Sequence, residues 1–211
     1  LRLPSVPPTA PLTRELPGPR SLVVAPDVGT TAWIDCAGHL PWGQSGDQRP
    51  DDARSLTWDL DPPDDPVVGH PVVRLQLRAD QPLASLSVKL CDVLPDGTSA
   101  LVTRGTLDLT YRAGVHGSPA PLVPGETYPV EVTLDACAYA WEAGNRLRVS
   151  IAGADWPNTV APPAPLTLTV DTTGTVVTAA VFLTSGASSP PRQARVSRTT
   201  LRPASRVPSG G

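Results

Sequence analysis

The chain has 211 residues, 40% of them apolar, and this length and composition suit one all-β domain with additional tails. Its formal net charge is −3, but five arginines near the C-terminus leave about −8 on the remainder, so the folded part is acidic and offers no basic face to nucleic acid. No apolar run approaches the ~18 residues of a membrane-spanning helix, so we expect no membrane partner.

The two ends of the chain differ in composition from its middle. Residues 1–20 contain six prolines, which remove backbone donors and fix φ, and they predict an extended arm without regular structure. Residues 185–211 are rich in Ser, Pro, Arg and Gly and predict a disordered tail, because they bury too little apolar surface to offset the entropy lost on ordering. Residues 21–184 form the single expected domain. Because the chain begins with Leu1 and contains no methionine, we expect a fragment or a processed product.

Between these ends, apolar and polar side chains alternate with a period of two, which is typical of antiparallel strands with one face in a core. The segments expected as strands are, in chain order, residues 22–24, 33–35, 55–59, 73–78, 86–91, 107–112, 130–134, 147–151, 166–170 and 175–183. The clearest three, residues 73–78, 86–91 and 107–112, each predict one solvent-facing side. Pro95-Asp96-Gly97 predicts a tight turn between two strands. The pattern therefore predicts an all-β sandwich of about ten mostly antiparallel strands, without a regular helix.

The sequence carries little that points to catalysis or metal binding. An α/β-hydrolase nucleophile needs a Gly-x-Ser-x-Gly turn, and the closest segment, residues 43–47 around Ser45, has Asp47 in place of the final glycine. The three histidines and three cysteines are too scattered for a zinc site or a redox pair. An acidic loop at residues 61–65 could hold calcium but is more often only hydrated. We expect no catalytic residue, metal ion or cofactor in this chain.

The tryptophans leave three alternatives open. Flat rings on a β-sandwich can pack in a core or against another domain, line a pocket, or stack on sugar rings. Alternation within a strand places Trp58 in the core, whereas Trp42 and Trp156 fall in loops that contain Gly or Pro. Packing or domain contact is the favoured interpretation. The full set is Trp33, Trp42, Trp58, Trp141 and Trp156.

Four segments, taken together, resemble the C-terminal non-catalytic domain of the X-Pro dipeptidyl-peptidase and cocaine-esterase hydrolase family. They are residues 47–57, which begin Asp47-Gln48-Arg49-Pro50; residues 88–97, which end Asp92-Val93-Leu94-Pro95-Asp96-Gly97; residues 143–151, which contain Arg146-Leu147-Arg148; and residues 154–158, which contain Asp155-Trp156-Pro157. The resemblance covers about residues 21–183. It implies a jelly-roll, galactose-binding-like form of the β-sandwich. The sequence departs from the pattern at Asn145, where relatives often have histidine, which puts a local hydrogen bond in doubt.

The same resemblance implies a parent serine hydrolase whose α/β-hydrolase domain, with a Ser-His-Asp triad, is absent from this chain. The chain would be an accessory domain that packs on this hydrolase domain. Residues 38–46 would then approach the active-site mouth, and we expect Leu40, Pro41 and Trp42 to line the substrate pocket. A structural role is expected for Asp47, Arg49, Arg54, Asp92, Asp96, Gly97, Arg146, Asp155 and Trp156.

Several points stay open at the level of sequence. The alternative function is an independent carbohydrate-binding module of the jelly-roll type. The parent's substrate, whether an X-Pro peptide, an ester or an acyl amide, depends on residues outside this chain. The oligomeric state is open, and for the compartment the cytoplasm is favoured over secretion.

Overall fold

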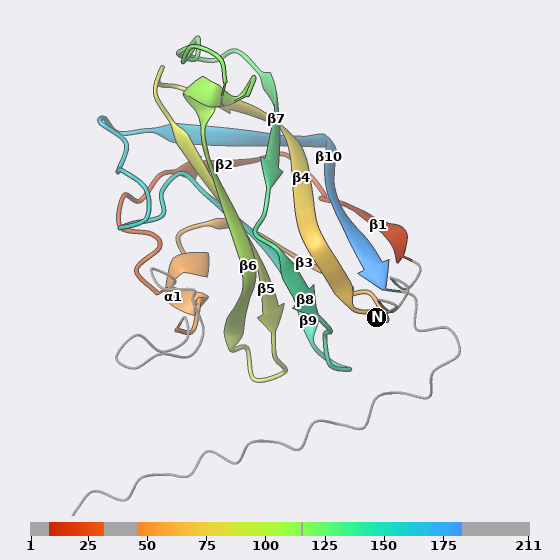
Figure 1. Ribbon diagram of the computed structural model, residues 1–211. Helices are drawn as coiled ribbons and strands as arrows, with labels where there is room; N and C mark the ends of the chain where they lie inside the picture. The colour runs from red at the N-terminus through yellow and green to blue at the C-terminus, as the bar shows by residue number, and fades with distance from the viewer. Residues whose placement is uncertain (1–8, 32–45, 115, 183–211) are drawn as a thin grey trace, which may run out of the picture.

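The computed structural model of the protein describes residues 9–31, 46–114 and 116–182, which form two facing antiparallel sheets (Figure 1). The strands in this part of the chain are β1 (Thr9–Glu15), β2 (Arg20–Val23), β3 (Leu56–Leu60), β4 (Val67–Ala79), β5 (Ser85–Val93), β6 (Ser99–Asp108), β7 (Tyr128–Thr133), β8 (Cys137–Tyr139), β9 (Arg146–Ala152) and β10 (Thr167–Phe182). The helical elements are one turn of α-helix, α1 (Arg49–Asp52), and a 3-10 turn, η1 (Leu109–Tyr111). The expected all-β antiparallel sandwich is therefore confirmed. The jelly-roll and galactose-binding-like assignments stay predictions.

The two sheets divide the strands unequally. The larger sheet has the order β1-β10-β4-β7, with β2 also paired to β10 and β8 to β4. The smaller sheet has the order β3-β9-β5-β6. Within it, β5 and β6 form a hairpin in which Leu94 N donates to Thr98 O, and the intervening turn contains Gly97 at a φ of +86°. The turn predicted at Pro95-Asp96-Gly97 is confirmed.

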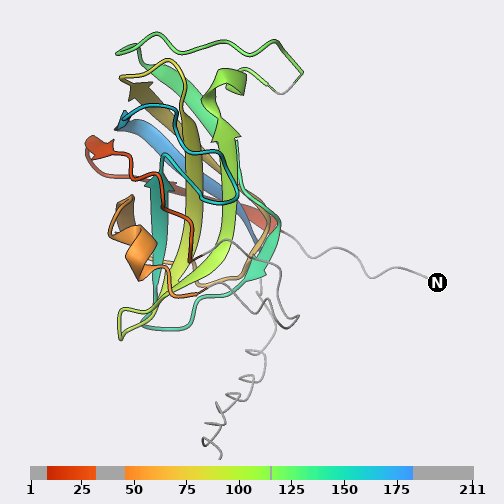
Figure 2. The same ribbon diagram turned by 90° about the vertical axis from the view of Figure 1, so that its left-hand side faces the viewer.

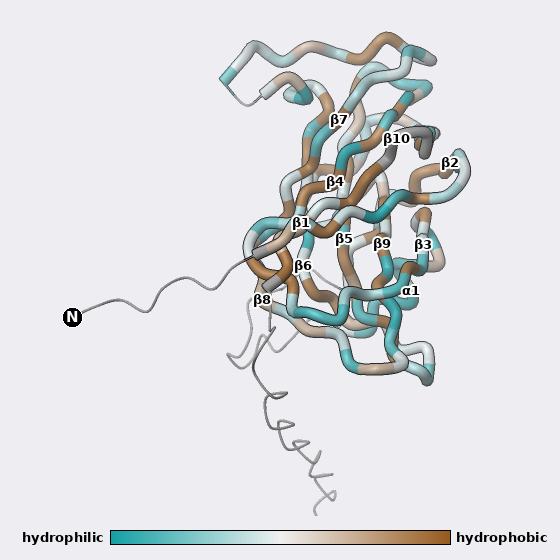
Figure 3. The backbone as a smooth tube through the Cα atoms, turned by 90° about the vertical axis from the view of Figure 1, so that its right-hand side faces the viewer, coloured by the Kyte–Doolittle hydropathy of each residue, from teal (hydrophilic) through white to brown (hydrophobic). Residues whose placement is uncertain are grey.

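The core lies between the sheets and consists of the apolar faces that the alternation predicts. Figure 3 shows apolar stretches (brown) along the strands and hydrophilic ones (teal) around α1. The buried apolar side chains of this core include Val73, Leu75 and Leu77 from β4, Leu86, Val88 and Leu90 from β5, and Leu147, Val149 and Ile151 from β9. Burial of each such side chain contributes on the order of 1.5–3 kcal/mol before the entropy of ordering is counted. In the described ranges no helix is long and apolar enough to cross a bilayer.

The prediction that the proline-rich segment lacks regular structure is wrong for residues 9–15. These residues form β1, which pairs with β10 from Thr9↔Phe182 to Glu15↔Val176. A proline is tolerated here because β1 is an edge strand of the larger sheet, so the donor that Pro11 lacks is not required by a second neighbour.

Three other strand predictions differ from the structure in extent. Residues 107–112 are not a separate strand, since β6 ends at Asp108, whose carboxylate accepts a 2.9 Å hydrogen bond from Thr110 N and caps η1. Residues 166–170 and 175–183 belong to one strand, β10, because the pairing with β4 continues across a register shift. The strand expected at residues 33–35 lies outside the described residues.

Candidate functional site

The first of the four family-like segments forms α1, which lies against the outer side of the smaller sheet. Figures 1 and 2 show α1, the connection after β2 (red) and the connection before β10 (cyan) on the same side of the molecule. Pro50 occupies the first turn of α1, where no backbone donor is needed. The segment is tied to the start of β6, since Gln48 N donates to Ser99 O over 2.8 Å and Ser99 N donates to Asp47 Oδ1 over 3.1 Å.

Lys89 projects from β5 into the space beneath α1. Its side chain is 3% exposed, and its Nζ lies 3.0 Å from Gln48 Oε1 and 3.1 Å from Asp51 Oδ2. Ser87 and Cys91, which share this face of β5, are buried as well. The expectation of a solvent-facing side on residues 86–91 is therefore wrong: α1 and the neighbouring connections cover that side. A charge in such a place is tolerated only when it is paired and hydrogen-bonded.

Asp51 is the partner that neutralises Lys89. Burial would raise the pKa of Asp51, but hydrogen bonds from the Thr31 hydroxyl and the Gly29 N–H, together with the Lys89 charge, outweigh burial and lower the pKa below its ordinary value. The Thr31 hydroxyl donates to Asp51 Oδ2 over 2.6 Å. Asp51 also accepts from Arg54 Nη2 over 3.2 Å, and Arg54 pairs with Asp27. Asp51 is thus ionised and links three separate segments of the chain.

A second group of charges lies beside the first, on β9 and β3. Arg148 Nε and Nη2 donate to the two carboxylate oxygens of Asp59 over 2.6 and 2.9 Å, and Arg148 Nη1 donates to Asp52 Oδ2 over 3.1 Å. Arg146 reaches the same Asp59 carboxylate at 3.2 Å. The Arg148 hydrogen bond is the main reason that the pKa of Asp59 is lowered, and Asp59 in turn raises the pKa of Arg148. Arg148 therefore joins the far end of α1 to the edge strand β3.

The charged side chains described so far, with Asp155 and Arg104, form one layer on the outer side of the smaller sheet, the charged layer. Asp155 is fully buried, and its Oδ2 lies 3.3 Å from Arg104 Nη1. Burial raises the pKa of Asp155, although the charges of Arg104 and Lys89 act in the opposite direction. Gly29 packs directly on Asp155 at a φ of +116°, where a Cβ atom would overlap the Asp155 carboxylate and backbone. Trp156 N donates to Val28 O over 2.6 Å, so the connections after β2 and after β9 are held together.

The other residues expected to have structural roles lie away from this layer or at its rim. Arg49 pairs with Asp47 at the surface. Asp96 accepts a 2.9 Å hydrogen bond from Thr98 N in the β5–β6 turn. Asp92 lies at the end of β5, where its Oδ2 accepts from Tyr139 and Asn145, each at 2.8 Å. Asn145 therefore makes a side-chain hydrogen bond of its own at the position where relatives were expected to have histidine.

The predicted pocket residues Leu40, Pro41 and Trp42, and also Ser45, lie outside the described residues. Among the described tryptophans, Trp58 is buried, as predicted, and its Nε1 donates to Pro17 O over 3.0 Å. Trp141 is also buried, whereas Trp156 is 49% exposed.

Sequence reasoning missed the members of the charged layer that come from strand faces or from the last position of α1. Alternation assigns the positions of these residues to solvent or to a loop. They are Lys89, Arg104, Arg148 and Asp52. Lys89 does carry a signal, because it is the only lysine in a chain that otherwise uses arginine. The compact ammonium of a lysine, unlike the planar guanidinium of an arginine, fits a buried site where two oxygens converge. Here these are Gln48 Oε1 and Asp51 Oδ2.

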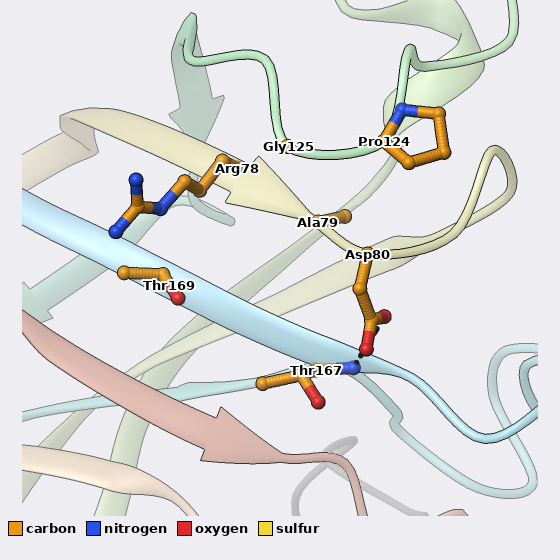
Figure 4. Close-up of a pocket in the computed structure, with 7 residues that line it drawn as sticks. All are labelled: Arg78, Ala79, Asp80, Pro124, Gly125, Thr167 and Thr169. Atoms are coloured by element: carbon orange, nitrogen blue, oxygen red, sulfur yellow. Dashed lines mark hydrogen bonds between the residues drawn. The ribbon is translucent and has the colours of Figure 1, made fainter.

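A shallow depression of about 370 Å³ lies elsewhere, on the larger sheet (Figure 4). It is lined by Arg78, Ala79, Asp80, Pro124, Gly125, Thr167 and Thr169. Asp80 Oδ1 accepts from Thr167 N over 2.8 Å, and Gly125 N donates to Ala79 O over 2.8 Å. The first bond joins the end of β4 to the start of β10, and the second joins the end of β4 to the connection before β7. None of the residues that line the depression is aromatic, so it offers no ring for stacking on sugars.

Comparison with known proteins assigns the chain to a family. Residues 14–199 match the X-Pro dipeptidyl-peptidase C-terminal non-catalytic domain. The chain belongs to this family. Two curated relatives, from Mycobacterium bovis and Mycobacterium tuberculosis, are named serine esterases, and each is 34% identical to this chain over 127 residues. These matches cover 52% of this chain and 20% of each relative.

Solved structures agree with the fold of the non-catalytic domain family. An aminopeptidase from a marine-sediment Thaumarchaeota archaeon matches with a TM-score of 0.64 at 22% identity, covering 79% of this chain and 33% of that protein. An α-amino acid ester hydrolase matches with a TM-score of 0.61 at 20% identity over the same shares of the two chains. A CocE/NonD family hydrolase from Staphylococcus aureus matches with a TM-score of 0.56 at 13% identity, covering 84% of this chain and 37% of that one. The chain thus spans a fifth of the curated relatives and about a third of the solved ones.

The buried pair Lys89–Asp51 is expected to stabilise this non-catalytic domain as a unit. Lys89→Met leaves the buried Asp51 with Arg54 as its remaining cationic partner and Gln48 Oε1 without its donor, and it is expected to lower the free energy of unfolding by about 3 kcal/mol. The double variant Lys89→Met/Asp51→Asn removes both charges and retains an acceptor for the Thr31 hydroxyl, so it should recover about 2 kcal/mol relative to additive losses. Urea unfolding of the parent, both single variants and the double variant measures this coupling. Strictly additive losses would contradict the pairing.

The lowered pKa values of Asp51 and Asp59 predict that the domain loses stability in acid. A carboxylate with a lowered pKa contributes stability fully above its ordinary pKa of 3.8 and loses it as the pH falls through the folded-state value, so the loss begins below about pH 4. Asp155 acts oppositely, since its pKa is raised. Asp59→Asn should therefore be less stable than the parent at pH 7, with the difference shrinking by pH 3. Urea unfolding midpoints of the parent and the variant at pH 7 and pH 3 measure this difference. Asp64→Asn, at an exposed position, is the control. A difference in midpoint between Asp59→Asn and the parent that is the same at both pH values would refute the expectation.

Proposed function

We propose that the chain is an accessory domain of a serine hydrolase of the X-Pro dipeptidyl-peptidase or acyl-esterase type. In this proposal it packs on an α/β-hydrolase domain of the same parent protein and helps to shape the substrate pocket. The observation that carries the proposal is the match of residues 14–199 to a domain described as C-terminal and non-catalytic. The share of each relative that the match covers also supports the proposal, because the named esterases, the aminopeptidase and the ester hydrolase all extend well beyond the matched part.

The described residues support a scaffolding role more than a catalytic one. The strongest cluster of titratable groups, on the outer side of the smaller sheet, is arranged as paired charges whose partners are other protein groups. His70 Nδ1 lies 2.9 Å from the carbonyl oxygen of Leu134, so the backbone orients this ring.

Pocket shaping is assigned to residues 38–46, with Leu40, Pro41 and Trp42 as an apolar wall. The described ends of the connection that contains them, Thr31 and Gly46, lie at the outer side of the smaller sheet beside α1. Large apolar side chains within a glycine-containing loop gain little unless another surface covers them. An adjoining hydrolase domain with a substrate acyl or leaving group supplies such a surface.

The isolated chain separates this proposal from the carbohydrate-binding alternative. Incubated with a p-nitrophenyl ester and with a glycan panel, it is expected to release no nitrophenol above the buffer rate and to retain no glycan. Added to a hydrolase domain of the parent type, it is expected to bind it. Turnover by the chain alone would contradict the accessory role, and specific glycan retention would favour the alternative.

Trp42→Ala tests the apolar wall in a polypeptide that joins this domain to its hydrolase domain. Loss of the ring is expected to lower kcat/KM for esters with a bulky acyl group by about tenfold and to leave esters with a small acyl group nearly unchanged. The matched control is Trp156→Ala, which removes a half-exposed ring from another connection. An equal loss for all substrates, or equal effects of both substitutions, would rule out the wall.

A further inference from the structure

Two segments that follow strands, residues 24–31 after β2 and residues 153–166 after β9, run beside each other at the surface (Figures 1 and 2). Two backbone hydrogen bonds join them: Val24 N donates to Leu166 O over 2.9 Å, and Trp156 N donates to Val28 O over 2.6 Å. We refer to residues 24–31 and 153–166 together as the paired connections.

The paired connections present apolar side chains to solvent. Trp156 is 49% exposed and Val160 is 85% exposed, and they are two of the five large apolar side chains exposed in the described ranges. A third, Val23, is 75% exposed and directly precedes the first connection. Exposed prolines add to this surface, namely Pro26, Pro157, Pro163 and Pro165. A single exposed apolar side chain is ordinary on a protein, whereas such a group indicates an interaction surface.

The paired connections also lack free charge. Their only charged side chains are Asp27 and Asp155. Asp155 is fully buried beside Arg104, and Asp27 pairs with Arg54 at the rim. A surface of this kind has no cations to attract the phosphates of nucleic acid or of anionic lipid, and it matches an apolar protein surface.

The backbone of the paired connections is fixed by the domain itself. Asp155 N donates to the Thr159 hydroxyl over 3.0 Å and Thr159 N donates to Asp155 O over 2.8 Å, so residues 155–159 form a closed turn that carries the Trp156 ring. Gly153 packs so closely on Val24 that a Cβ atom would lie 2.4 Å from its side chain. A surface held in this way loses little conformational entropy when a partner binds, which favours a stable interface.

We propose that the paired connections are the surface through which this domain docks on the catalytic domain of its parent hydrolase, with Trp156 and Val160 as anchors. The inference rests on the proposed function, which supplies the catalytic domain as the partner. The lengths of the solved relatives favour this occupant, because two of them contain the fold within 33% of their chains and leave the remaining two thirds to cover it. Large apolar anchors in an uncharged surface are typical of such interfaces.

Hydroxyl-radical footprinting tests the inference by measuring how accessible single side chains are to solvent. It is applied to this chain alone and to the polypeptide that joins it to its hydrolase domain, both at the same low protein concentration. Modification of Trp156 and Val160 is expected to be about tenfold slower in the joined polypeptide, because docking excludes water from both anchors. Val123, which is 58% exposed in the connection before β7, is the internal control and should be modified at the same rate in both.

The other outcomes of this measurement overturn the inference in distinguishable ways. Protection of Val123 without protection of Trp156 and Val160 places the interface elsewhere, while the proposed function stands. Protection of no side chain in the joined polypeptide means that the domains do not pack, and the proposed function then fails as well. Protection that rises with protein concentration assigns the surface to a second copy. Protection of Trp156 by phosphatidylcholine vesicles, but not by the hydrolase domain, assigns it to a membrane.

The variant Val160→Glu tests the anchors without disturbing the fold. Because Val160 is 85% exposed in the chain, the urea midpoint of the isolated chain should stay at the parental value. In the joined polypeptide docking would bury the new carboxylate, so modification of Trp156 is expected to rise about fivefold. Ala143→Glu, at an exposed position between β8 and β9, is the matched control and should leave Trp156 protected. Parental protection of Trp156 in Val160→Glu, or an equal rise in Ala143→Glu, would overturn the inference.

The docking role also defines what Trp156→Ala does to activity. Its ring is assigned to the interface between the domains and not to the substrate. Its loss is therefore expected to change kcat/KM for bulky and small acyl esters by the same factor in the joined polypeptide. A selective effect on bulky esters would contradict the docking role. Trp156→Ala thus remains a matched control for the selective effect expected of Trp42→Ala.

Discussion

A single buried positive charge, the ammonium of Lys89, constrains most of what lies on the outer side of the smaller sheet. Removing such a group from water is costly, so its partners must be held at fixed distances. Asp51 and Gln48 satisfy it from α1, which places that one-turn helix on β5 although a helix of four residues has almost no stability of its own. The connections that contribute Thr31, Gly29 and Asp155 then pack around the same point. The molecule therefore has three layers on this side: the two sheets and, outside the smaller sheet, the charged layer to which α1 contributes.

The four segments that carry the family resemblance are far apart in sequence and lie close together in the charged layer. Residues 47–57 form α1 and enter β3, residues 88–97 run from β5 into its hairpin turn, and residues 143–151 form most of β9. Since β3, β9 and β5 are neighbours in the smaller sheet, three segments share one surface, and residues 154–158 continue directly from it. The segments that carry the resemblance therefore form a spatial unit, held by ion pairs from Lys89, Arg148 and Arg104.

Sequence reasoning recovered the parts of the fold that depend on local pattern. Alternation located the apolar faces of β4, β5 and β9, and the Pro-Asp-Gly signal located the hairpin, because both follow from backbone geometry within a few residues. It failed where long-range contacts decide. Nothing near Lys89 in sequence shows that residues some 40 positions earlier will cover it, and nothing in residues 9–15 shows that β10 will pair with them. The positions named for the pocket, Leu40, Pro41 and Trp42, came from the resemblance and from their apolar character in a glycine-containing loop, and they lie outside the described residues.

The long strand β10 pairs with β1, β2 and β4, which come from the first half of the described chain. During synthesis, the larger sheet consequently cannot close until the ribosome has released residues up to Phe182. Until then β4 has one unsatisfied edge, and β1 and β2 have no partner within their own sheet. Such high contact order slows folding and prolongs the exposure of strand edges to other nascent chains. For this domain, the emergence of β10 from the ribosome is the step that pairs these strand edges.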